Sequence, residues 1–473
     1  MFFHSISGHL PLFSAPPPTS SLRCISKRTL RLLPVLTVLG TIVWYLTLQK
    51  LHSPESAPNT KLPPLYQEYR DREDSLPHYD LEAPYPNGRH AKYLLIGNHQ
   101  QGVGWGNVLQ EVFLNAFLAY NIKRSFVFYN YEWSMESNFS MYNDHLIPST
   151  IPLSALLSGP LVGELMHPPG VPRAISVNHF RKICSNRTVL PGDEIRALLQ
   201  GEKPSQILAS AVQKLGAMED RCIEIPRGTW QIWNYLVFGS KDVLELWPAL
   251  KRSPMIMQFG WSPLIHSAFD SNRKLFEPWS LLSPFFGGTR EPSTSLQPIP
   301  GLLAVHLRRG DFSNHCEGLG LWSSDFNGFN KFDELPDKFQ VPPGGAWGEN
   351  TPENMETYRR RCYPSIPQIV EKVLDVRRKI PGLARLYIMT NGDRAWLVEL
   401  TGALQRGPEK WNFISSSRDL TVTWEQKFVA HALDMYVAQR AHAFIGNGWS
   451  SLTSNTVMLR MGGKHNPNTT FFW

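Results

Sequence analysis

The 473-residue chain alternates short apolar runs with longer amphipathic ones, a pattern typical of a parallel α/β fold. A first block opens with an apolar run at 92–96, continues through an amphipathic run at 108–120 and reaches a second apolar run at 125–129. A second block repeats strand and helix in turn, with elements expected at 302–307, 355–379, 384–389, 423–438 and 443–445. Strands that alternate with helices in this way predict doubly wound domains.

The three strands of the second block all end in small, polar or charged residues. The first runs into Arg308-Arg309-Gly310-Asp311, and the others run into Thr390-Asn391-Gly392-Asp393 and Gly446-Asn447-Gly448-Trp449-Ser450-Ser451. The carboxyl ends of parallel strands meet at one edge of a sheet, which is where open α/β sheets bind ligands. The sequence therefore predicts a site at this edge.

Arg308 and Arg309 suggest what that site binds. Guanidinium groups are planar, permanently charged donor forks, which suit a diphosphate. Gly310 would allow a sharp turn, and Asp311 would fix the rotamer of one arginine. The alternative is a surface turn after an ordinary strand, but the preceding apolar strand and His306 favour a site.

A glycine-rich loop, Gly102-Val103-Gly104-Trp105-Gly106-Asn107, precedes the amphipathic run of the first block. Backbone N–H groups at a helix N-terminus can accept a phosphate. The alternative is a tight turn with no ligand, which many α/β domains have at this point.

Residues 32–49 form an uncharged, mostly apolar run that follows four basic residues. Eighteen helical residues come close to the roughly 30 Å of a bilayer core. We therefore expect a cytosolic tail at 1–31, a transmembrane signal anchor at 32–51, and a Pro- and charge-rich stem at 52–90 that leads to a lumenal body. A cleaved signal peptide is the alternative, but no small-x-small cleavage site follows closely.

The net charge of +7 belongs to the expected anchor region, since residues 1–50 contain five basic residues and no acidic one. The rest of the chain has 42 of the 47 basic residues against 40 acidic ones. No basic stripe interleaved with aromatic residues stands out, so nucleic acid is not an expected partner.

Several features agree with a lumenal body. Glycosylation acceptor triplets begin at Asn138, Asn186 and Asn468. Past the expected anchor the cysteines form an even set that allows three disulfide pairings: Cys184, Cys222, Cys316 and Cys362. The pattern has no Cys-x-x-Cys or Cys/His cluster, so structural zinc is not expected.

The composition of two further segments predicts their structure. Residues 313–351, rich in Gly, Trp, Phe and Pro, are expected to form a long loop, which in a compact domain is usually functional or mobile. The aromatic stretch 229–235 is expected to be core rather than a carbohydrate platform.

Together these motifs resemble the GDP-fucose-dependent fucosyltransferases, in particular the protein O-fucosyltransferase-like superfamily. The resemblance rests on the His-x-Arg signature at 306–308, the strand ending in Thr390-Asn391-Gly392-Asp393, and Asp434 followed by the segment 444–453. The loop at Gly104-Trp105-Gly106-Asn107 is similar to the family's Gly-x-x-Asn segment. The resemblance implies two facing Rossmann-like domains of the GT-B type, at 91–299 and 300–473, with the donor bound mainly to the second.

The resemblance also implies roles for individual residues. Arg308 would contact the donor diphosphate and stabilise the charge that accumulates as GDP leaves, with Ser450 and Ser451 bonded to a phosphate. Asp434 would lie near the guanine. The remaining donor-binding positions would be Gly104, Gly106, Asn107, His306, Arg309, Asp311 and Asp393, of which Asn107 would reach the donor phosphate or the acceptor hydroxyl.

The donor substrate would be GDP-fucose, with no cofactor and no metal, because the chain contains no Asp-x-Asp triplet and the family is metal-independent. The general base is open. Some relatives carry a Glu in the opening loop where this chain has Val103, and Glu111, one helical turn after Asn107, is a candidate whose alternative is a solvated helix position. Otherwise the leaving phosphate takes the proton.

The expected function is transfer of fucose, with inversion, from GDP-fucose to a hydroxyl of a protein or glycan acceptor. The enzyme would be a single-pass protein of the endoplasmic reticulum or Golgi membrane. The alternatives are the same fold with another sugar nucleotide, and a non-catalytic lumenal protein that binds a nucleotide sugar.

Overall fold

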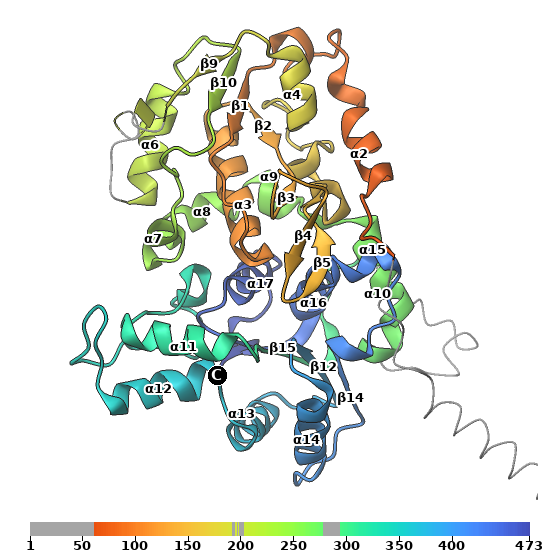
Figure 1. Ribbon diagram of the computed structural model, residues 1–473, viewed down its shortest axis with the longest axis vertical. Helices are drawn as coiled ribbons and strands as arrows, with labels where there is room; N and C mark the ends of the chain where they lie inside the picture. The colour runs from red at the N-terminus through yellow and green to blue at the C-terminus, as the bar shows by residue number, and fades with distance from the viewer. Residues whose placement is uncertain (1–60, 192–193, 196, 198–202, 278–293) are drawn as a thin grey trace, which may run out of the picture. The chain divides into compact units, whose positions relative to one another are not determined.

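Two five-stranded parallel sheets carry the fold of the computed structural model (Figure 1). The structure describes residues 61–473 except 192–193, 196, 198–202 and 278–293. One compact unit comprises Pro63–Trp473. The predicted fold class, α/β with parallel sheets, is confirmed.

The first sheet has the strand order β8-β2-β1-β10-β9, and every neighbouring pair in it is parallel. Its strands are β1 (Tyr93–Ile96), β2 (Ser125–Phe128), β8 (Ile175–Ser176), β9 (Thr188–Val189) and β10 (Cys222–Ile225). Alternate residues point to opposite faces. Leu94 joins the core that contains α3 (Trp105–Asn121), whereas Tyr93 and Leu95 pack with Phe180 of α4 (Val177–Ile183).

The second sheet has the strand order β14-β13-β12-β15-β16 and is also parallel throughout. Its strands are β12 (Ile299–Leu307), β13 (Arg385–Thr390), β14 (Phe413–Ser416), β15 (Ala441–Gly446) and β16 (Thr470–Phe472). On one face Leu303, Val305 and Leu307 pack with apolar residues of α13 (Ile366–Lys379) and α14 (Arg394–Gln405). The other face is covered by α10 (Pro263–Phe276) and α16 (Ala430–Arg440).

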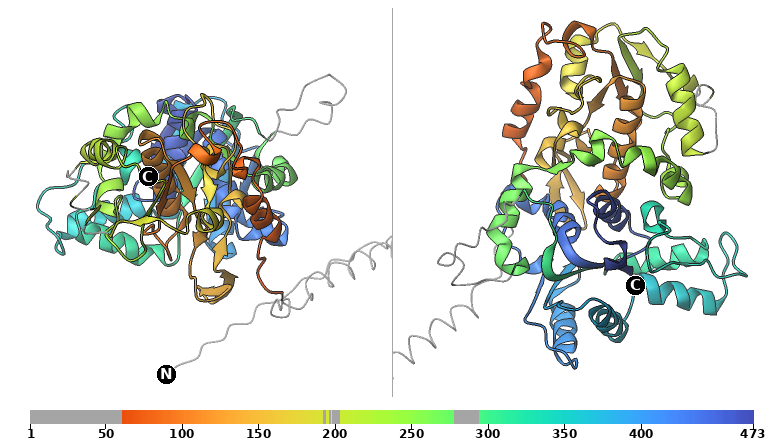
Figure 2. Two further views of the ribbon diagram at one scale, coloured as in Figure 1. Left: turned by 90° about the horizontal axis from the view of Figure 1, so that it is seen from above. Right: turned by 180° about the vertical axis from the view of Figure 1, so that it is seen from behind.

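One helix, α17 (Ser451–Gly462), lies between the two sheets and packs against α3, as the front view in Figure 1 and the rear view in Figure 2 both show.

α11 (Phe312–Leu321) and α12 (Pro352–Cys362) pack against each other. The other helices are α2 (Gln67–Asp74), α6 (Pro204–Lys214), α7 (Tyr235–Phe238), α8 (Trp247–Leu250), α9 (Pro254–Met257) and α15 (Trp424–Lys427). Short antiparallel pairs join β3 (Tyr131–Glu132) to β6 (Thr150–Ile151), β4 (Phe139–Tyr142) to β5 (His145–Pro148), and β7 (Leu157–Ser158) to β11 (Gly260–Trp261).

Three expected elements differ from the observed ones. The helix expected at 355–379 is two helices, α12 and α13, because the residue before Pro364 is disfavoured in a helix and Ser365 caps a new one. The helix expected at 423–438 is likewise divided into α15 and α16. The long loop expected at 313–351 begins as a helix, α11, so it is shorter than predicted.

Residues 66–90, which we expected in the stem, pack on the body instead. Tyr66 is buried and its hydroxyl donates to the Glu425 carbonyl at 2.7 Å. Buried Glu73 accepts from the Ser154 N–H at 2.9 Å. The compact unit therefore begins at Pro63 and not at residue 91. α10, which precedes the boundary expected at 299, packs against α16 and the strands β13 and β14.

The predicted anchor at 32–51 lies outside the described residues. Among the helices of the described part of the chain, none combines the length and the apolar character needed to cross a bilayer.

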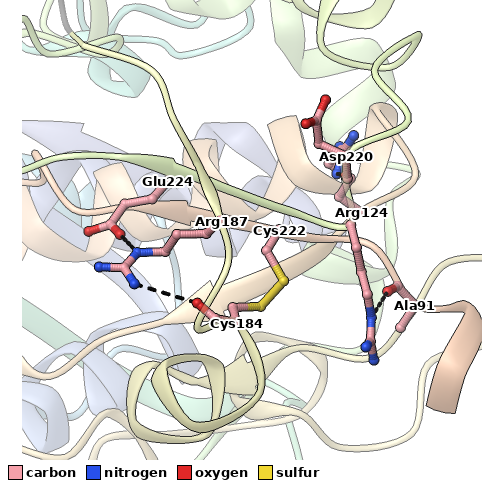
Figure 3. Close-up of a disulfide and its surroundings, with 8 residues drawn as sticks. Ala91, Arg124, Cys184, Arg187, Asp220, Cys222 and Glu224 are labelled. Atoms are coloured by element: carbon pink, nitrogen blue, oxygen red, sulfur yellow. Dashed lines mark hydrogen bonds and ion pairs between the residues drawn. A yellow bond between two sulfur atoms is a disulfide. The ribbon is translucent and has the colours of Figure 1, made fainter.

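Two disulfides select one of the three pairings that the sequence left open. Cys184, at the end of α4, pairs with Cys222 in β10, close to the ion pair of Arg187 with Glu224 (Figure 3). Cys316 of α11 pairs with Cys362 of α12. The stretch 229–235 is core at Ile232 and Trp233, as expected, while Tyr235 is exposed.

Candidate functional site

The polar ends of β12, β13 and β15 lie at one edge of the second sheet. β12 is hydrogen-bonded to β13 on one side and to β15 on the other, with His306 opposite Met389 and Val305 opposite Ile445. All three strands run in the same direction, so the turns that begin at Arg308, Asn391 and Asn447 are neighbours. The structure therefore confirms the prediction that the three strand ends lie together at one edge of the sheet.

Arg308 is the arginine that remains available to a ligand. Its Nη2 lies 3.2 Å from Asp311 Oδ2, and its guanidinium carbon is 4.9 Å from the centroid of the Phe312 ring. The side chain keeps 34% of its surface exposed. Its Nε is buried and bonds to no residue of the described chain. Asp311 and Phe312 thus hold the guanidinium in place while donors stay available.

Arg309 points elsewhere, and this corrects the expectation of two guanidiniums acting together. It is buried between Tyr363 and Trp396, each 4.4 Å from its guanidinium carbon, and it donates to the Pro364 carbonyl at 2.6 Å. Burial lowers its pKa from the ordinary value. Arg309 therefore ties β12 to the start of α13 rather than facing a ligand.

Asn391, which lies within a motif but is absent from the predicted site residues, fixes the arginine turn. Its Oδ1 accepts from the Arg309 N–H at 2.7 Å, and its Nδ2 donates to the Arg309 carbonyl at 3.0 Å and to Asp311 at 3.3 Å. Asp393 has a local role, because its carboxylate caps α14 by accepting from the Trp396 N–H at 2.8 Å. The position of Asn391, first after its strand, is the signal that could have identified it.

His306 is buried on β12, and its Nδ1 lies 2.9 Å from Thr453 Oγ1. Burial, reinforced by the nearby charge of Arg308, lowers the pKa of His306 to about 3. The ring is therefore neutral at physiological pH. The His306 side chain therefore joins β12 to α17, and it does not supply a positive charge to a diphosphate.

Ser450 and Ser451 stand at the N-terminus of α17. Ser450 is the N-cap, and its hydroxyl accepts from the Thr453 N–H at 3.5 Å. Asn447 anchors the preceding turn by donating to the Cys362 carbonyl at 2.8 Å. A helix N-terminus presents backbone N–H groups and the positive end of the helix dipole, so this turn is suited to an anion.

The glycine-rich loop has a packing role at Gly106. A Cβ at this position would overlap the backbone nitrogen of Leu452 and lie 2.6 Å from Ser451 Oγ. Asn455 of α17 donates to the Gly106 carbonyl at 2.5 Å. Gly106 thus lets the N-termini of α3 and α17 meet, while Gly104 is exposed and has open space around its Cα. Asn107 is half-buried beside this contact.

Asp434 lies in α16 behind β13. Its carboxylate accepts from the Tyr387 hydroxyl at 2.6 Å and from the Ser417 hydroxyl at 2.9 Å. Burial raises the pKa of Asp434 to about 6 despite these hydrogen bonds. Ser417 follows β14 directly. It was not predicted because β14 has only four residues, which is too short a run to be recognised as a strand in the sequence.

Glu111 does not face the cleft, and it is not the solvated residue of the alternative reading. It is 2% exposed, and its Oε2 accepts from the Gln100 N–H at 2.7 Å. Burial raises its pKa to about 8. Its carboxyl group therefore holds the loop that leads into α3.

Within the described residues, no group of three or more His, Cys, Asp or Glu side chains could hold a metal ion. Metal independence itself remains a prediction.

No protein-family profile and no curated protein sequence matches the chain. Among solved structures it is similar to POFUT1 in complex with GDP-fucose, with 15% identity, a TM-score of 0.48, and coverage of 80% of this chain and 98% of that one. It is similar to NodZ alpha-1,6-fucosyltransferase soaked with GDP-fucose, with 14% identity, a TM-score of 0.34, and coverage of 78% and 92%. For a mutant of Arabidopsis thaliana FUT1 in complex with GDP the identity is 9%, the TM-score 0.34, and the coverage 89% and 77%. At these values the likeness concerns the fold alone.

Proposed function

We propose that the chain is an inverting, metal-independent glycosyltransferase that transfers fucose from GDP-fucose to a hydroxyl of a protein or glycan. One observation carries the proposal: Arg308, held by Asp311 and Phe312, lies at the same sheet edge as the N-terminus of α17. A fixed guanidinium and a helix N-terminus both attract an anion with several charges. A nucleoside diphosphate fits this pair.

The proposed chemistry places Arg308 on the diphosphate, where negative charge develops as the bond between the sugar carbon and the phosphate oxygen breaks. The acceptor hydroxyl attacks that carbon from the opposite side, forms the new C–O bond and inverts the configuration. Donors fixed before the reaction stabilise the developing charge without reorganisation. Asn391 supports this by holding both backbone groups of Arg309, the residue next to Arg308.

In this proposal the proton of the acceptor goes to the leaving phosphate. Glu111 is not proposed as the base, because its carboxyl group is buried and bonded to the loop backbone. Because Glu111 is buried, the site has no identified general base. This favours a second candidate function, a protein that binds a nucleotide sugar without transferring it. Release of GDP from GDP-fucose in the presence of a mixture of glycoprotein acceptors separates the two candidates.

We also propose that the protein works in the lumen of the secretory pathway as a single-pass membrane protein. The apolar run at 32–49 supports the anchor. Support for an oxidising compartment comes from the two disulfides. Asn138, Asn186 and Asn468 are all exposed, as glycosylation requires.

The test is a calorimetric and thermal-shift titration of the full chain, in detergent, with GDP, UDP and CMP in the absence of metal. We expect selective stabilisation by GDP that is lost in Arg308→Ala. Arg359→Ala, which removes an exposed arginine paired with Glu356 on α12, is the matched control and should bind GDP normally. No response to any nucleotide would refute the proposal, and selective binding of UDP or CMP would change the donor.

A further inference from the structure

We infer that Trp347, stacked on Trp322, is a platform that binds an oligosaccharide. Our further inference, which rests on the proposed function, is that the acceptor of the transfer is a glycan rather than an unglycosylated polypeptide. The platform is the surface formed by these two indole rings, in the segment between α11 and α12.

The two rings form an ordered, exposed stack. Their centroids are 5.5 Å apart and their planes differ by 13°. Trp322 lies across Gly318 of α11, where an added Cβ would be 3.5 Å from its ring. Trp347 stacks on Trp322 and is 79% exposed, against 44% for Trp322. A large flat apolar face is thus presented to solvent.

The chain around Trp347 is held in place by hydrogen bonds. Gly348 N–H donates to the Leu321 carbonyl at 2.9 Å, and Asn350 donates to the Gly320 carbonyl at 2.7 Å. Asn354 in turn donates to Asn350 Oδ1 at 2.7 Å, and the disulfide Cys316–Cys362 joins the two flanking helices. Because the rings are fixed before a ligand arrives, binding loses little conformational entropy.

The platform is connected to the candidate site at both ends of α11. The helix starts directly after Asp311, and its ten residues place Trp322 about 15 Å further along. After Trp322 the chain returns to the turn before α17, where the Ser324 carbonyl accepts from Trp449 Nε1 at 3.0 Å and Asn327 N–H donates to the Gly448 carbonyl at 2.8 Å. A ligand of several sugar units could therefore touch Trp347 while its end is at Arg308.

The size of the platform favours a glycan over a second copy of the chain. At the upper limit of about 250 Å² for an indole side chain, the exposed fractions leave roughly 300 Å² of apolar surface. Stable protein interfaces need about 800 Å² from each partner. A pyranose ring has one face of C–H groups that can cover an indole while its hydroxyl groups remain in water.

The experiment titrates the full chain with chitotetraose, mannotetraose and a released N-glycan, and with an unglycosylated Ser/Thr-containing peptide. The variants are Trp347→Ala, Trp347→Phe and Leu236→Ala, a control on α7 that is equally exposed at 79%. We expect millimolar or tighter binding of at least one oligosaccharide, a loss of about tenfold or more in Trp347→Ala, and partial retention in Trp347→Phe. Leu236→Ala should bind normally.

The inference would be overturned if no oligosaccharide bound, if Trp347→Ala bound with equal affinity, or if the peptide bound in a way that depends on Trp347. A change of oligomeric state in Trp347→Ala would assign the platform to a second copy and would also overturn it. GDP titration of the same variants separates this inference from the proposed donor. Normal GDP binding without glycan binding refutes the platform alone, and glycan binding without GDP binding refutes the donor alone.

Discussion

Replacement of Glu111 by Gln should stabilise the protein, and the gain should grow as the pH rises. Glu111 is buried in α3 at 2% exposure, and its Oε2 accepts from the Gln100 N–H. Glutamine keeps a carbonyl oxygen for this hydrogen bond and cannot ionise. The substitution therefore removes the pH-dependent cost of a buried carboxyl group, and the amide N–H groups that it adds affect the stability equally at every pH.

The magnitude follows from the pKa of Glu111, which burial raises from 4.5 to about 8. Below pH 4.5 the carboxyl group is protonated in both the folded and the unfolded chain, so it has no effect on the pH dependence. Between pH 4.5 and about pH 8, Glu111 of the unfolded chain releases its proton, whereas Glu111 of the folded chain keeps it. The free energy of unfolding of the wild type then falls by about 1.4 kcal/mol per pH unit. The cost reaches about 3 kcal/mol at pH 7 and about 5 kcal/mol at pH 8, above which it is constant.

The assay is urea unfolding of the wild type and Glu111→Gln at pH 5, 6, 7 and 8, with the unfolding free energies compared at each pH. Glu136→Gln, at an exposed position of the same half of the molecule, is the control, and its effect should stay within about 0.5 kcal/mol. A difference that is constant from pH 5 to pH 8 would mean that Glu111 is already ionised in the folded protein at pH 5. The burial argument would then be wrong.

Arg309→Ala should lower the unfolding free energy by about 2–4 kcal/mol, since it removes packing between two rings and leaves the Pro364 carbonyl unpaired, but calorimetric GDP affinity should change little. A strong loss of GDP binding without a loss of stability would place Arg309 in the site. Gly106→Ala should cost at least about 1–3 kcal/mol in thermal unfolding, because a Cβ meets the backbone of Leu452, and Gly104→Ala is the control with open space. Equal effects of the two substitutions would contradict the close contact. Asn391→Ala should lower both stability, by about 2 kcal/mol, and GDP affinity, since two backbone hydrogen bonds of the arginine turn are lost; unchanged GDP affinity would show that the turn needs no support. A chelator should leave transferase activity unchanged, and inhibition reversed by a divalent metal would contradict the role given to Arg308.

The central strands and the edge where they end could be predicted from the sequence, because β12, β13 and β15 are continuous apolar runs that stop at polar residues. The direction of each side chain could not. Arg308 and Arg309 are adjacent and chemically identical, yet one is half-exposed beside Asp311 and the other is buried between two rings supplied by Tyr363 and Trp396. These rings come from segments more than 50 residues away, so no local pattern signals them.

Glu111 was misread for a related reason. A carboxylate on a helix is normally solvated, but α3 lies between the first sheet and α17 and is buried on nearly every face. The strands β10, β14 and β16 have three or four residues each and give too short a periodic signal to be recognised. Residues 66–90 were assigned to a stem on composition, which does not show that Tyr66 and Glu73 find buried partners in the body.

The contact between Gly106 and the start of α17 has a consequence for how the two halves of the molecule can move. The backbones of α3 and α17 touch there, and Asn455 bonds across the contact. Sliding of one helix past the other at this point would break the contact, so the N-termini of α3 and α17 are held at a fixed spacing. If the proposed donor binds beside α17, the glycine-rich loop that leads into α3 therefore stays next to it.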